Sequence, residues 1–363
     1  MKRYLCLIIS IFTLAFFTPQ SSASTLTITD MAERKVTVPH DPAKIVCIGP
    51  GALRLIVYLQ AQDKLSGVET MEKMNPGGRP YWIAHPEIHD LPACGPGGPS
   101  GINKKPDLEA IMRAAPEVIF VTYMDKSMAD EVQKTLNIPV VVLSYGTFAN
   151  FDETIYGSLK IAGKILNRDK RAEELITYIE SLKKDLNKRT AENTADKKPR
   201  VFVGGIGYRG SYGIESTEKD YLPLKWINAV NMAEEIEGRI GDHVLVDKET
   251  LLKLSPDIIF IDGGGLTLVD EDYRKKMDYY DTLKAFKDRK IYVLLPFNWY
   301  TTNIETALAD SYAIGKILYK DNFKDLDIEQ KTDEIYNTMA GKPVYKDMEK
   351  DYGAIGAIAP FLK

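Results

Sequence analysis

One stretch of this chain occurs twice, at residues 107–121 and at residues 247–261, and the two copies align without a gap. Each copy starts with an Asp where a helix N-cap belongs and carries a Glu in the first turn, which suits the helix dipole. Apolar residues follow at helical spacing, a Pro ends the helix, and a run rich in β-branched residues indicates a buried strand. Two matched helix–strand units predict two lobes built on one plan. A coincidental repeat of a common α/β connection is the alternative.

The length of 363 residues suits two domains better than one hydrophobic core. Hydrophobic residues make up 44% of the chain and charged residues 27%, as in ordinary soluble globular proteins. The formal net charge is -4, and the sequence has no basic tract. Composition and charge therefore give no indication of nucleic-acid binding.

The first residues have the pattern of a secretory signal peptide. Lys2 and Arg3 precede an apolar run at residues 4–17, and small residues follow up to Ala23. A basic start, an apolar core and a small-residue cleavage site predict removal of residues 1–23 by cleavage after about Ala23. Cys6 lies near the start of the apolar run, whereas a lipid-modified Cys would lie at its end. We therefore expect an exported, soluble protein and no lipoprotein.

Strands and helices alternate along both halves of the sequence. A hairpin is predicted at residues 26–38, and a long loop at residues 69–103 is expected to be functional because of its length and its aromatic residues. Buried strands are predicted at residues 45–48, 65–68, 118–121 and 140–143, then at 200–204, 258–261 and 291–294. Helices are predicted at residues 52–59, 128–136, 222–229, 278–286, 304–319 and 328–339, and no element is assigned after residue 342. Such alternation indicates parallel sheets covered by helices on both faces.

Between the two halves lies a purely helical stretch. Apolar residues form one helical stripe over residues 155–166 and another over residues 172–186, and the second helix covers about 20 residues, or roughly 30 Å. A helix of that length is a stiff connector. The predicted fold is therefore α/β, with two Rossmann-like lobes that contain parallel sheets, at residues 24–150 and 199–363. One long rigid helix within the connecting helices of residues 151–198 joins them.

Several motifs in this order give the chain a family resemblance. The matching residues are Asp30–Pro39, then Ala43–Val46 leading into Pro50, and both copies of the repeat. The chain resembles the substrate-binding proteins of ABC importers, in the group with a rigid helical backbone between the lobes (class III). Members of that group take up iron–siderophore complexes, haem, cobalamin and, in some cases, molybdate or tungstate. The resemblance spans about residues 26–340.

The resemblance implies a membrane partner as well as a small ligand. In that family a surface glutamate on each lobe docks to arginines of the ABC permease, and the matching positions are Glu109 and Glu249. The alternative role for each is a favourable interaction with the first turn of its own helix, worth only tenths of a kcal/mol. The resemblance also implies a periplasmic location and a monomer.

The ligand is expected between the lobes, where loops from the carboxyl ends of both sheets face each other. Arginine offers a fork of donors to anionic groups, aromatic rings offer flat walls, and glycines let backbone N–H groups approach an anion. The candidate residues of the first lobe are Pro50, Gly51, Arg54, Arg79, Tyr81, Trp82, Gly97, Gly98 and Tyr123. Those of the second lobe are Tyr208, Arg209, Tyr212, Asn298, Trp299 and Tyr300. For Arg54 and Arg79, a solvated or salt-bridged surface position is the alternative.

Metal and thiol chemistry are weakly indicated. The four histidines are scattered over turns, so no protein metal site is predicted, although capture of Fe(III) by tyrosines stays open. Cys47 and Cys94 both precede glycine-rich turns, and either a disulfide or two buried free thiols is compatible with the sequence.

The expected function is capture and delivery without catalysis and without a cofactor of the protein's own. An iron complex, such as a siderophore-type chelate, haem or a related metal complex, is the first expectation for the ligand. A molybdate or tungstate oxyanion is the alternative. An exported two-domain hydrolase is a distant alternative, because the sequence has no G-x-S-x-G elbow.

Overall fold

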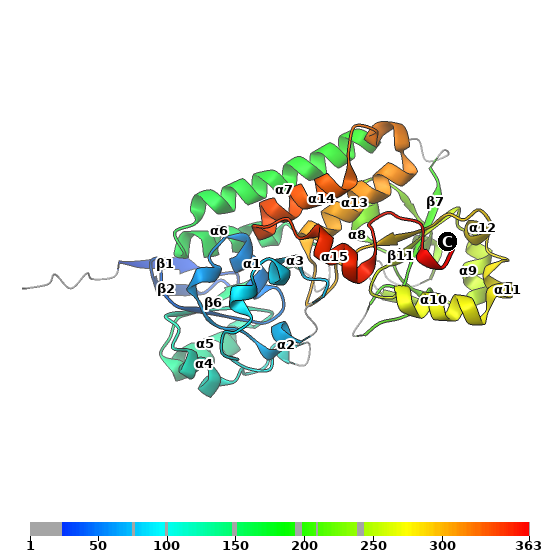
Figure 1. The fold of residues 1–363 in the computed structure, drawn as a ribbon. Helices are drawn as coiled ribbons and strands as arrows, with labels where there is room; N and C mark the ends of the chain where they lie inside the picture. Colours follow the sequence, from blue (N-terminus) through cyan, green and yellow to red (C-terminus); the bar gives the residue numbers. More distant parts are fainter. Residues whose placement is uncertain are drawn as a thin grey trace, which may run out of the picture.

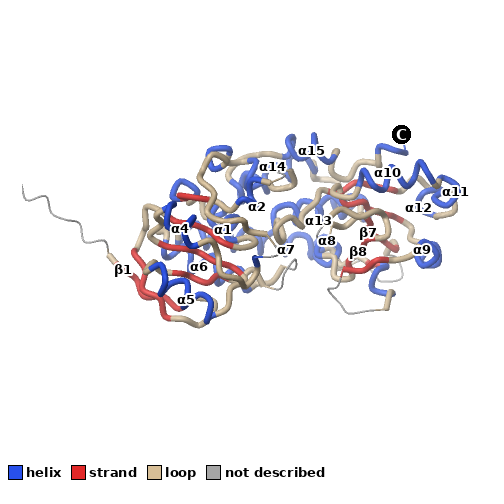
Figure 2. Tube along the Cα trace, turned by 90° about the horizontal axis from the view of Figure 1, so that it is seen from below, coloured by secondary structure: helices blue, strands red, loops and turns tan. Residues whose placement is uncertain are grey.

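The computed structural model describes residues 24–74, 77–98, 101–146, 151–192, 198–207, 210–237 and 243–362. It consists of two lobes side by side, with long helices along one edge of both (Figure 1). Seen from below, the strands gather in two separate bodies with helices between them (Figure 2). The predicted α/β fold with two lobes and parallel sheets is confirmed.

The first lobe holds a four-stranded parallel sheet in the order β4-β3-β5-β6. Its strands are β3 (Ile45–Ile48), β4 (Leu65–Gly67), β5 (Val118–Thr122) and β6 (Val140–Leu143). Its helices include α1 (Ala52–Tyr58), α4 (Leu108–Ala114) and α5 (Lys126–Leu136), and the hairpin β1 (Thr25–Thr29) and β2 (Lys35–Pro39) lies at its edge. The strands β3, β5 and β6 are buried throughout, as parallel strands covered on both faces should be.

The second lobe repeats this plan with the order β12-β11-β7-β9, again parallel. The strands are β7 (Arg200–Gly204), β9 (Val230–Asn231), β11 (Ile258–Asp262) and β12 (Ile291–Leu294). A small antiparallel pair, β8 (Ser216–Glu218) with β10 (His243–Leu245), is added beside it. The carboxyl ends of each sheet's strands lie at one edge, so their loops can share a surface.

The repeated stretch forms the same structure twice. The Asp107 side chain accepts a hydrogen bond from Ala110 N at 2.9 Å at the start of α4. The Asp247 side chain accepts one from Thr250 N at 2.7 Å at the start of α9 (Lys248–Leu254). Both helices end in a left-handed residue, Ala115 with φ 48° and Ser255 with φ 44°, one position before the proline. The duplicated cap and stop explain why the two stretches align without a gap.

Two helices connect the lobes, α6 (Thr154–Ile165) and α7 (Asp169–Thr190), and α7 has 22 residues. Its buried stripe packs on α6 and α13 (Ile304–Leu318), which in turn packs on α14 (Ile328–Ala340). Helix α14 also contacts α1 and α3 of the first lobe. One cluster of buried apolar residues therefore runs through both lobes and the connecting helices. Among the described helices, none is long and apolar enough to span a bilayer.

Some local predictions were wrong. The segment 69–103, predicted as a loop, contains α2 (Thr70–Lys73) and α3 (Pro80–Ile83). The helix predicted at 278–286 is broken into α11 (Met277–Tyr280) and α12 (Lys284–Lys287), and α8 (Leu222–Trp226) is shorter than predicted. Helices α10 (Leu266–Lys275) and α15 (Tyr345–Tyr352) were not predicted. These are mostly single turns, where tertiary contacts outweigh local periodicity.

Both cysteines of the described residues are free and buried. The two thiols belong to different apolar clusters: Cys94 packs with Val46 and Ile48, while Cys47 packs in the other cluster. Because side chains alternate along β3, Cys47 points to the opposite face of the sheet from Val46 and Ile48. Of the two possibilities left open by the sequence, the structure therefore has two buried thiols.

Candidate ligand site between the lobes

The loops at the carboxyl ends of the two sheets meet between the lobes. The segment 296–303, which follows β12, reaches across and contacts first-lobe segments that follow β3, β4 and β6. Several of the sequence-predicted residues lie at this contact, and two buried carboxyl groups that the sequence analysis missed lie beside them. The contact between the lobes is therefore the place to test for a ligand.

Glu69 forms the centre of one side of the contact. Its carboxylate accepts a hydrogen bond from the Tyr300 hydroxyl at 2.7 Å and from Gly49 N at 3.0 Å. The Tyr300 hydroxyl accepts one from Gly98 N at 2.9 Å. A methyl group at Gly97, which has φ 67°, would lie 2.9 Å from the Glu69 side chain, so the loop packs directly on it. Burial raises the pKa of Glu69 to about 7.

Arg54 is fully buried and binds backbone carbonyls of the second-lobe segment 296–303. Its guanidinium donates to the carbonyl of Trp299 at 2.7 Å, to that of Thr302 at 2.9 Å and to the Tyr145 hydroxyl at 3.2 Å. The guanidinium also lies over the Tyr81 ring, 4.7 Å from its centre. Arg54 thus joins the lobes. Its two terminal nitrogens donate to the protein rather than to a ligand.

Arg79 is also fully buried. It donates to Glu72 at 2.6 Å and to the carbonyl of Met74 at 3.1 Å, and it lies between the rings of Trp82 and Trp299, at 5.2 Å and 5.8 Å. The Tyr81 hydroxyl donates to the same carboxylate of Glu72 at 2.7 Å. Neither predicted arginine occupies an exposed, salt-bridged surface position, since both are 0% exposed.

Several buried polar atoms at this contact have no hydrogen-bond partner among the described residues, including the Arg54 guanidinium nitrogen Nε and the Asn303 oxygen Oδ1. Two others are the Trp299 indole nitrogen Nε1, a donor, and the Glu72 carboxylate oxygen Oε1, an acceptor. Buried polar groups are nearly always paired with protein, water or ligand, so both atoms are candidates for ligand contact. They come from opposite lobes.

The remaining first-lobe candidates shape the backbone of the contact. Gly51 has φ 82°, and a methyl group there would lie 2.6 Å from the Tyr145 ring, so only glycine fits without a shift. The carbonyl of Pro50 accepts a hydrogen bond from the Thr122 hydroxyl at 2.8 Å. The half-buried Tyr123 interacts with Thr301 of the opposite lobe. These residues therefore shape the first-lobe backbone that faces the segment 296–303.

Three carboxyl groups are buried in the second lobe beside β8, β11 and β12. Burial raises the pKa of Asp262 to about 7 and that of Glu218 to about 8, and it raises the pKa of Asp310 as well. Asp262 accepts a hydrogen bond from Gly264 N at 2.8 Å, and Asp310 from Leu295 N at 3.0 Å. Among the described residues, no group of three or more His, Cys, Asp or Glu side chains could hold a metal ion. These three groups are therefore protonatable acceptors inside the second lobe.

The other second-lobe candidates are separated. Asn298 is half-buried and accepts from the Thr302 hydroxyl at 3.4 Å, at the contact. Tyr212 lies instead against His243 of β10, with ring centres 5.4 Å apart. Tyr208 and Arg209 lie outside the described residues. Their predicted roles stay predictions.

Glu69, Glu72, Tyr145 and Glu305 were missed by the sequence analysis. Glu305 is fully buried in α13 and accepts a hydrogen bond from the Tyr58 hydroxyl of α1. Glu69 could have been found, because it follows β4 directly and therefore lies at the carboxyl end of a parallel strand. Tyr145 follows β6 in the same way, whereas Glu72 and Glu305 lie in helices that no strand end marks in the sequence.

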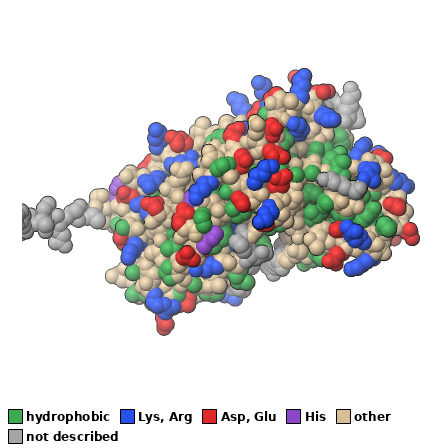
Figure 3. Space-filling model, viewed as in Figure 1, with side chains coloured by type: hydrophobic (Ala, Val, Ile, Leu, Met, Phe, Trp, Pro, Cys, Tyr) green, Lys and Arg blue, Asp and Glu red, His purple; other side chains and the backbone are tan. Residues whose placement is uncertain are grey.

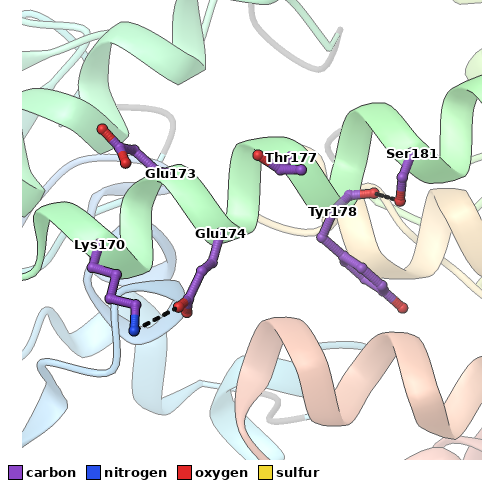
Figure 4. A pocket seen from close by; sticks show the side chains of 6 residues that line it. All are labelled: Lys170, Glu173, Glu174, Thr177, Tyr178 and Ser181. Atoms are coloured by element: carbon purple, nitrogen blue, oxygen red, sulfur yellow. Dashed lines mark hydrogen bonds and ion pairs between the residues drawn. The ribbon is translucent and has the colours of Figure 1, made fainter.

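Two hollows on the described surface lie elsewhere. One, of about 530 Å³, follows the outer face of α7, where Lys170 pairs with Glu174 at 3.9 Å and Tyr178 points toward α14 (Figure 4). The other, of about 630 Å³, lies by the amino end of β7 and is lined by residues that include Lys198, Lys219 and Asn228. Neither lies at the carboxyl ends of the two main sheets.

The predicted docking residues are on the surface. Glu109 is exposed on α4, and Glu249 is exposed on α9, where its carboxylate pairs with Lys253 at 2.7 Å. Acidic and basic side chains are intermingled over the face drawn in Figure 3, which agrees with the absence of a basic tract from the sequence.

Two parallel-sheet lobes, a helical connector and a contact at the facing strand ends define a bilobal binding protein of the helical-backbone class. Residues 45–296 match the family described as periplasmic binding protein, so the chain belongs to that family. This confirms the family resemblance found in the sequence.

Known relatives cover most of the chain. It is 24% identical over 328 residues to the molybdate-binding protein MolA of Haemophilus influenzae. The alignment covers 85% of this chain and 89% of that protein. It is 26% identical over 227 residues to the high-affinity heme uptake system protein IsdE of Staphylococcus aureus, over 60% of this chain and 73% of that protein. The solved structure of the Haemophilus influenzae MolA bound to molybdate has a TM-score of 0.68 at 22% identity, with 88% of this chain and 98% of that chain covered. At that identity the structural likeness shows the fold.

Proposed function

We propose that this periplasmic binding protein captures an iron complex between its lobes and delivers it to the permease of an ABC importer. The proposed ligand is a siderophore-type chelate, haem or a related metal complex. The observation that carries the choice is the composition of the contact between the lobes. The terminal nitrogens Nη1 and Nη2 of both arginines are bound by protein partners there, while buried carboxyl groups and aromatic rings remain.

The acidic lining weighs against a bare dianion. Glu69, Asp262 and Glu218 are all buried, and an oxyanion beside them would meet like charge whenever they are ionised. A chelate can instead use the rings of Trp82 and Trp299 as flat walls and the unpaired Trp299 Nε1 and Glu72 Oε1 as polar partners. Aromatic walls with few polar groups are typical of small-molecule sites.

A molybdate or tungstate oxyanion is the second candidate. It is supported by the similarity to the Haemophilus influenzae molybdate-binding protein over 85% of this chain. It is also supported by the backbone donors Gly49 N and Gly98 N, which already bind the oxygens of Glu69 and Tyr300. An oxyanion would have to replace Glu69 and Tyr300 as the acceptor of these hydrogen bonds. Glu69 would then have to become neutral or move away.

The test is a thermal-shift series on the mature chain, residues 24–363. The probes are ferric catecholate, ferric hydroxamate and ferric citrate complexes, haem, cobalamin, molybdate and tungstate, with sulfate as a control. A ligand that binds only the native state adds about 2.7 kcal/mol at 100 times its Kd, which raises Tm. A shift with a chelate supports the proposal. A shift with molybdate or tungstate alone establishes the second candidate, and no shift with any probe overturns both.

Tryptophan fluorescence locates the bound ligand. The chain has three tryptophans, and Trp82 and Trp299 lie at the contact, while Trp226 packs on Phe151 with ring centres 5.5 Å apart. Quenching that is lost in Trp299→Phe and kept in Trp226→Phe places the ligand between the lobes. Quenching that survives Trp299→Phe and Trp82→Phe contradicts this placement.

The chain is proposed to act as an exported monomer without catalysis. Its relatives are described as binding and uptake proteins. The predicted signal peptide, residues 1–23, lies outside the described residues. N-terminal sequencing of the protein from a periplasmic extract checks cleavage after about Ala23. Hydrolysis of ester or glycoside substrates by the purified protein would contradict the binding role.

A further inference from the structure

The hollow of about 630 Å³ beside β7 is lined by a buried lysine. Lys219 follows β8 directly, and it is only 4% exposed. Its ammonium donates one hydrogen bond, to the backbone carbonyl of Ile236, which also lines the hollow. An ammonium has three N–H donors, so two donors of Lys219 are without an acceptor among the described residues.

The charge of Lys219 is not compensated by any carboxylate of the described residues within ion-pair distance. The acid next to it in the chain, Asp220, pairs with Lys225 at 3.0 Å instead. Burial removes most of the hydration of an ammonium, so a buried lysine without a charged partner is unfavourable. An anion bound in the hollow would supply the missing partner.

The remaining lining offers a second cation and an apolar wall. Lys198 is half-buried and also lines the hollow, and no carboxylate of the described residues forms an ion pair with it. The buried Leu224 and the half-buried Ala229 contribute apolar surface. The hollow therefore combines unpaired positive charge with a surface suited to a hydrocarbon group.

Two carboxylates of the lining, Glu234 and Glu237, are exposed. Water and salt screen exposed charges strongly, whereas a buried charge is screened much less. The buried ammonium of Lys219 therefore determines which charge the interior of the hollow prefers.

The backbone around Lys219 is held in place by a buried amide. Asn231 of β9 is 4% exposed, and its side-chain nitrogen donates to the carbonyls of Glu218 and Lys219, at 2.9 Å each. Its side-chain oxygen accepts from Ala233 N at 3.1 Å. A group fixed in this way loses little conformational entropy when a ligand binds.

We propose that this hollow is a second small-molecule site, for an organic anion whose anionic oxygens bind Lys219 and whose apolar part lies against Leu224 and Ala229. Its volume is within the range of roughly 300–1,000 Å³ that is usual for small-molecule sites. An ammonium is a compact point charge and binds carboxylate and phosphate oxygens alike, so the class is set by charge and apolar body together. The hollow lies by the amino end of β7, away from the contact between the lobes, so the proposal does not depend on the ligand captured there.

The test is calorimetric titration of the mature chain with benzoate, hexanoate and phenyl phosphate, which all carry an anionic group on an apolar body. Benzamide has the body without the charge, and sulfate and inorganic phosphate have the charge without the body. At least one of the three organic anions is expected to bind, and benzamide, sulfate and inorganic phosphate are expected to bind at least about tenfold more weakly. The tighter of benzoate and phenyl phosphate identifies the anionic group.

Lys219→Met is expected to weaken binding of the organic anion at least about tenfold, because it removes the charged donor. The Tm of the ligand-free variant is expected not to fall, because a buried charge without a charged partner is removed. The matched control is Lys225→Met in the same lining, where the exposed lysine is already paired with Asp220. Its affinity for the organic anion is expected to stay within about twofold of wild type.

A second variant serves if Lys219→Met folds poorly. Ala229→Trp keeps Lys219 and fills the hollow, so it is expected to abolish binding.

Four results would overturn the inference. They are no binding of any organic anion, equal binding of benzamide, binding that survives Lys219→Met or Ala229→Trp, and equal binding of sulfate or inorganic phosphate. The last result would show an adventitious ion only. None of these results bears on capture between the lobes, which the tryptophan fluorescence of Trp299 measures separately.

Discussion

The Tyr300 hydroxyl donates a hydrogen bond to the Glu69 carboxylate at 2.7 Å, and these residues lie in different lobes, 231 positions apart. Glu69 is 4% exposed and Tyr300 is 6% exposed. The bond therefore joins the two sheets' loops inside the protein, out of contact with bulk water. Its strength depends on the charge of Glu69, which makes the contact between the lobes sensitive to pH.

Glu69→Gln is predicted to reduce the loss of stability at neutral pH. The pKa of Glu69 is raised by burial from an ordinary 4.5 to about 7, so the folded state binds more protons than the unfolded state in that interval. Stability is therefore highest below about pH 4.5 for this group and is lost as pH rises to about 7. The full difference is about 3 kcal/mol. Tm measured from pH 5 to 8 should fall less steeply in Glu69→Gln than in wild type.

The pKa values of Asp262 and Glu218 are raised as well, so the stability of wild type also falls with pH because of them. The contribution of Glu69 is therefore the difference in Tm between variant and wild type at each pH. Glu131→Gln is the control, because that carboxylate is on the surface, where its side chain is 55% exposed. If Tm fell equally steeply with pH in Glu69→Gln and in wild type, the pH dependence would not come from Glu69.

Arg54→Met is predicted to lower the free energy of unfolding by about 3 kcal/mol or more. The substitution keeps much of the volume but leaves the carbonyl of Trp299 without its donor and removes one of the two donors to the carbonyl of Thr302. Urea denaturation measures the loss. Arg113→Met, on the exposed face of α4, is the control and should change stability by less than about 0.5 kcal/mol. A loss below about 1 kcal/mol in Arg54→Met would show that water replaces the guanidinium.

Glu109→Arg together with Glu249→Arg is predicted to abolish transport and to leave ligand affinity unchanged. Both side chains are exposed and form no hydrogen bond or ion pair with the described residues between the lobes, so reversal of their charge should act on the partner. Uptake of the radiolabelled ligand by cells that carry the variant measures the effect. Glu131→Arg with Glu271→Arg is the matched control, with side chains 55% and 57% exposed on α5 and α10. Normal uptake in the Glu109 and Glu249 variant would refute docking.

The two thiols are predicted to be unreactive in the native protein and to leave Tm independent of reducing agent. Burial raises the pKa of Cys47 well above its usual range and that of Cys94 to about 12, which suppresses the reactive thiolate. Mass spectrometry after alkylation should find two modified thiols in urea and none without it. A fall in Tm with dithiothreitol would indicate a disulfide instead.

Much of the fold was predictable because its determinants are local. The N-caps of Asp107 and Asp247, the prolines after α4 and α9, and the apolar runs of β5 and β11 are all encoded within a few neighbouring residues. The short helices of 69–103 and the broken helix at 278–286 were missed because single turns gain little from local periodicity.

The sequence by itself determined that there are two lobes on one plan, a helical connector, and a glutamate at the same place in each lobe. Those features depend on short-range propensity and on spacing along the chain. Only the tertiary structure decided what the contact between the lobes is made of. Arg54 and Arg79 are withdrawn from solvent by carbonyls and a carboxylate, and Glu69 meets Tyr300, because loop ends far apart in sequence converge there. Burial, pairing and raised pKa values follow from that convergence, which no local pattern specifies.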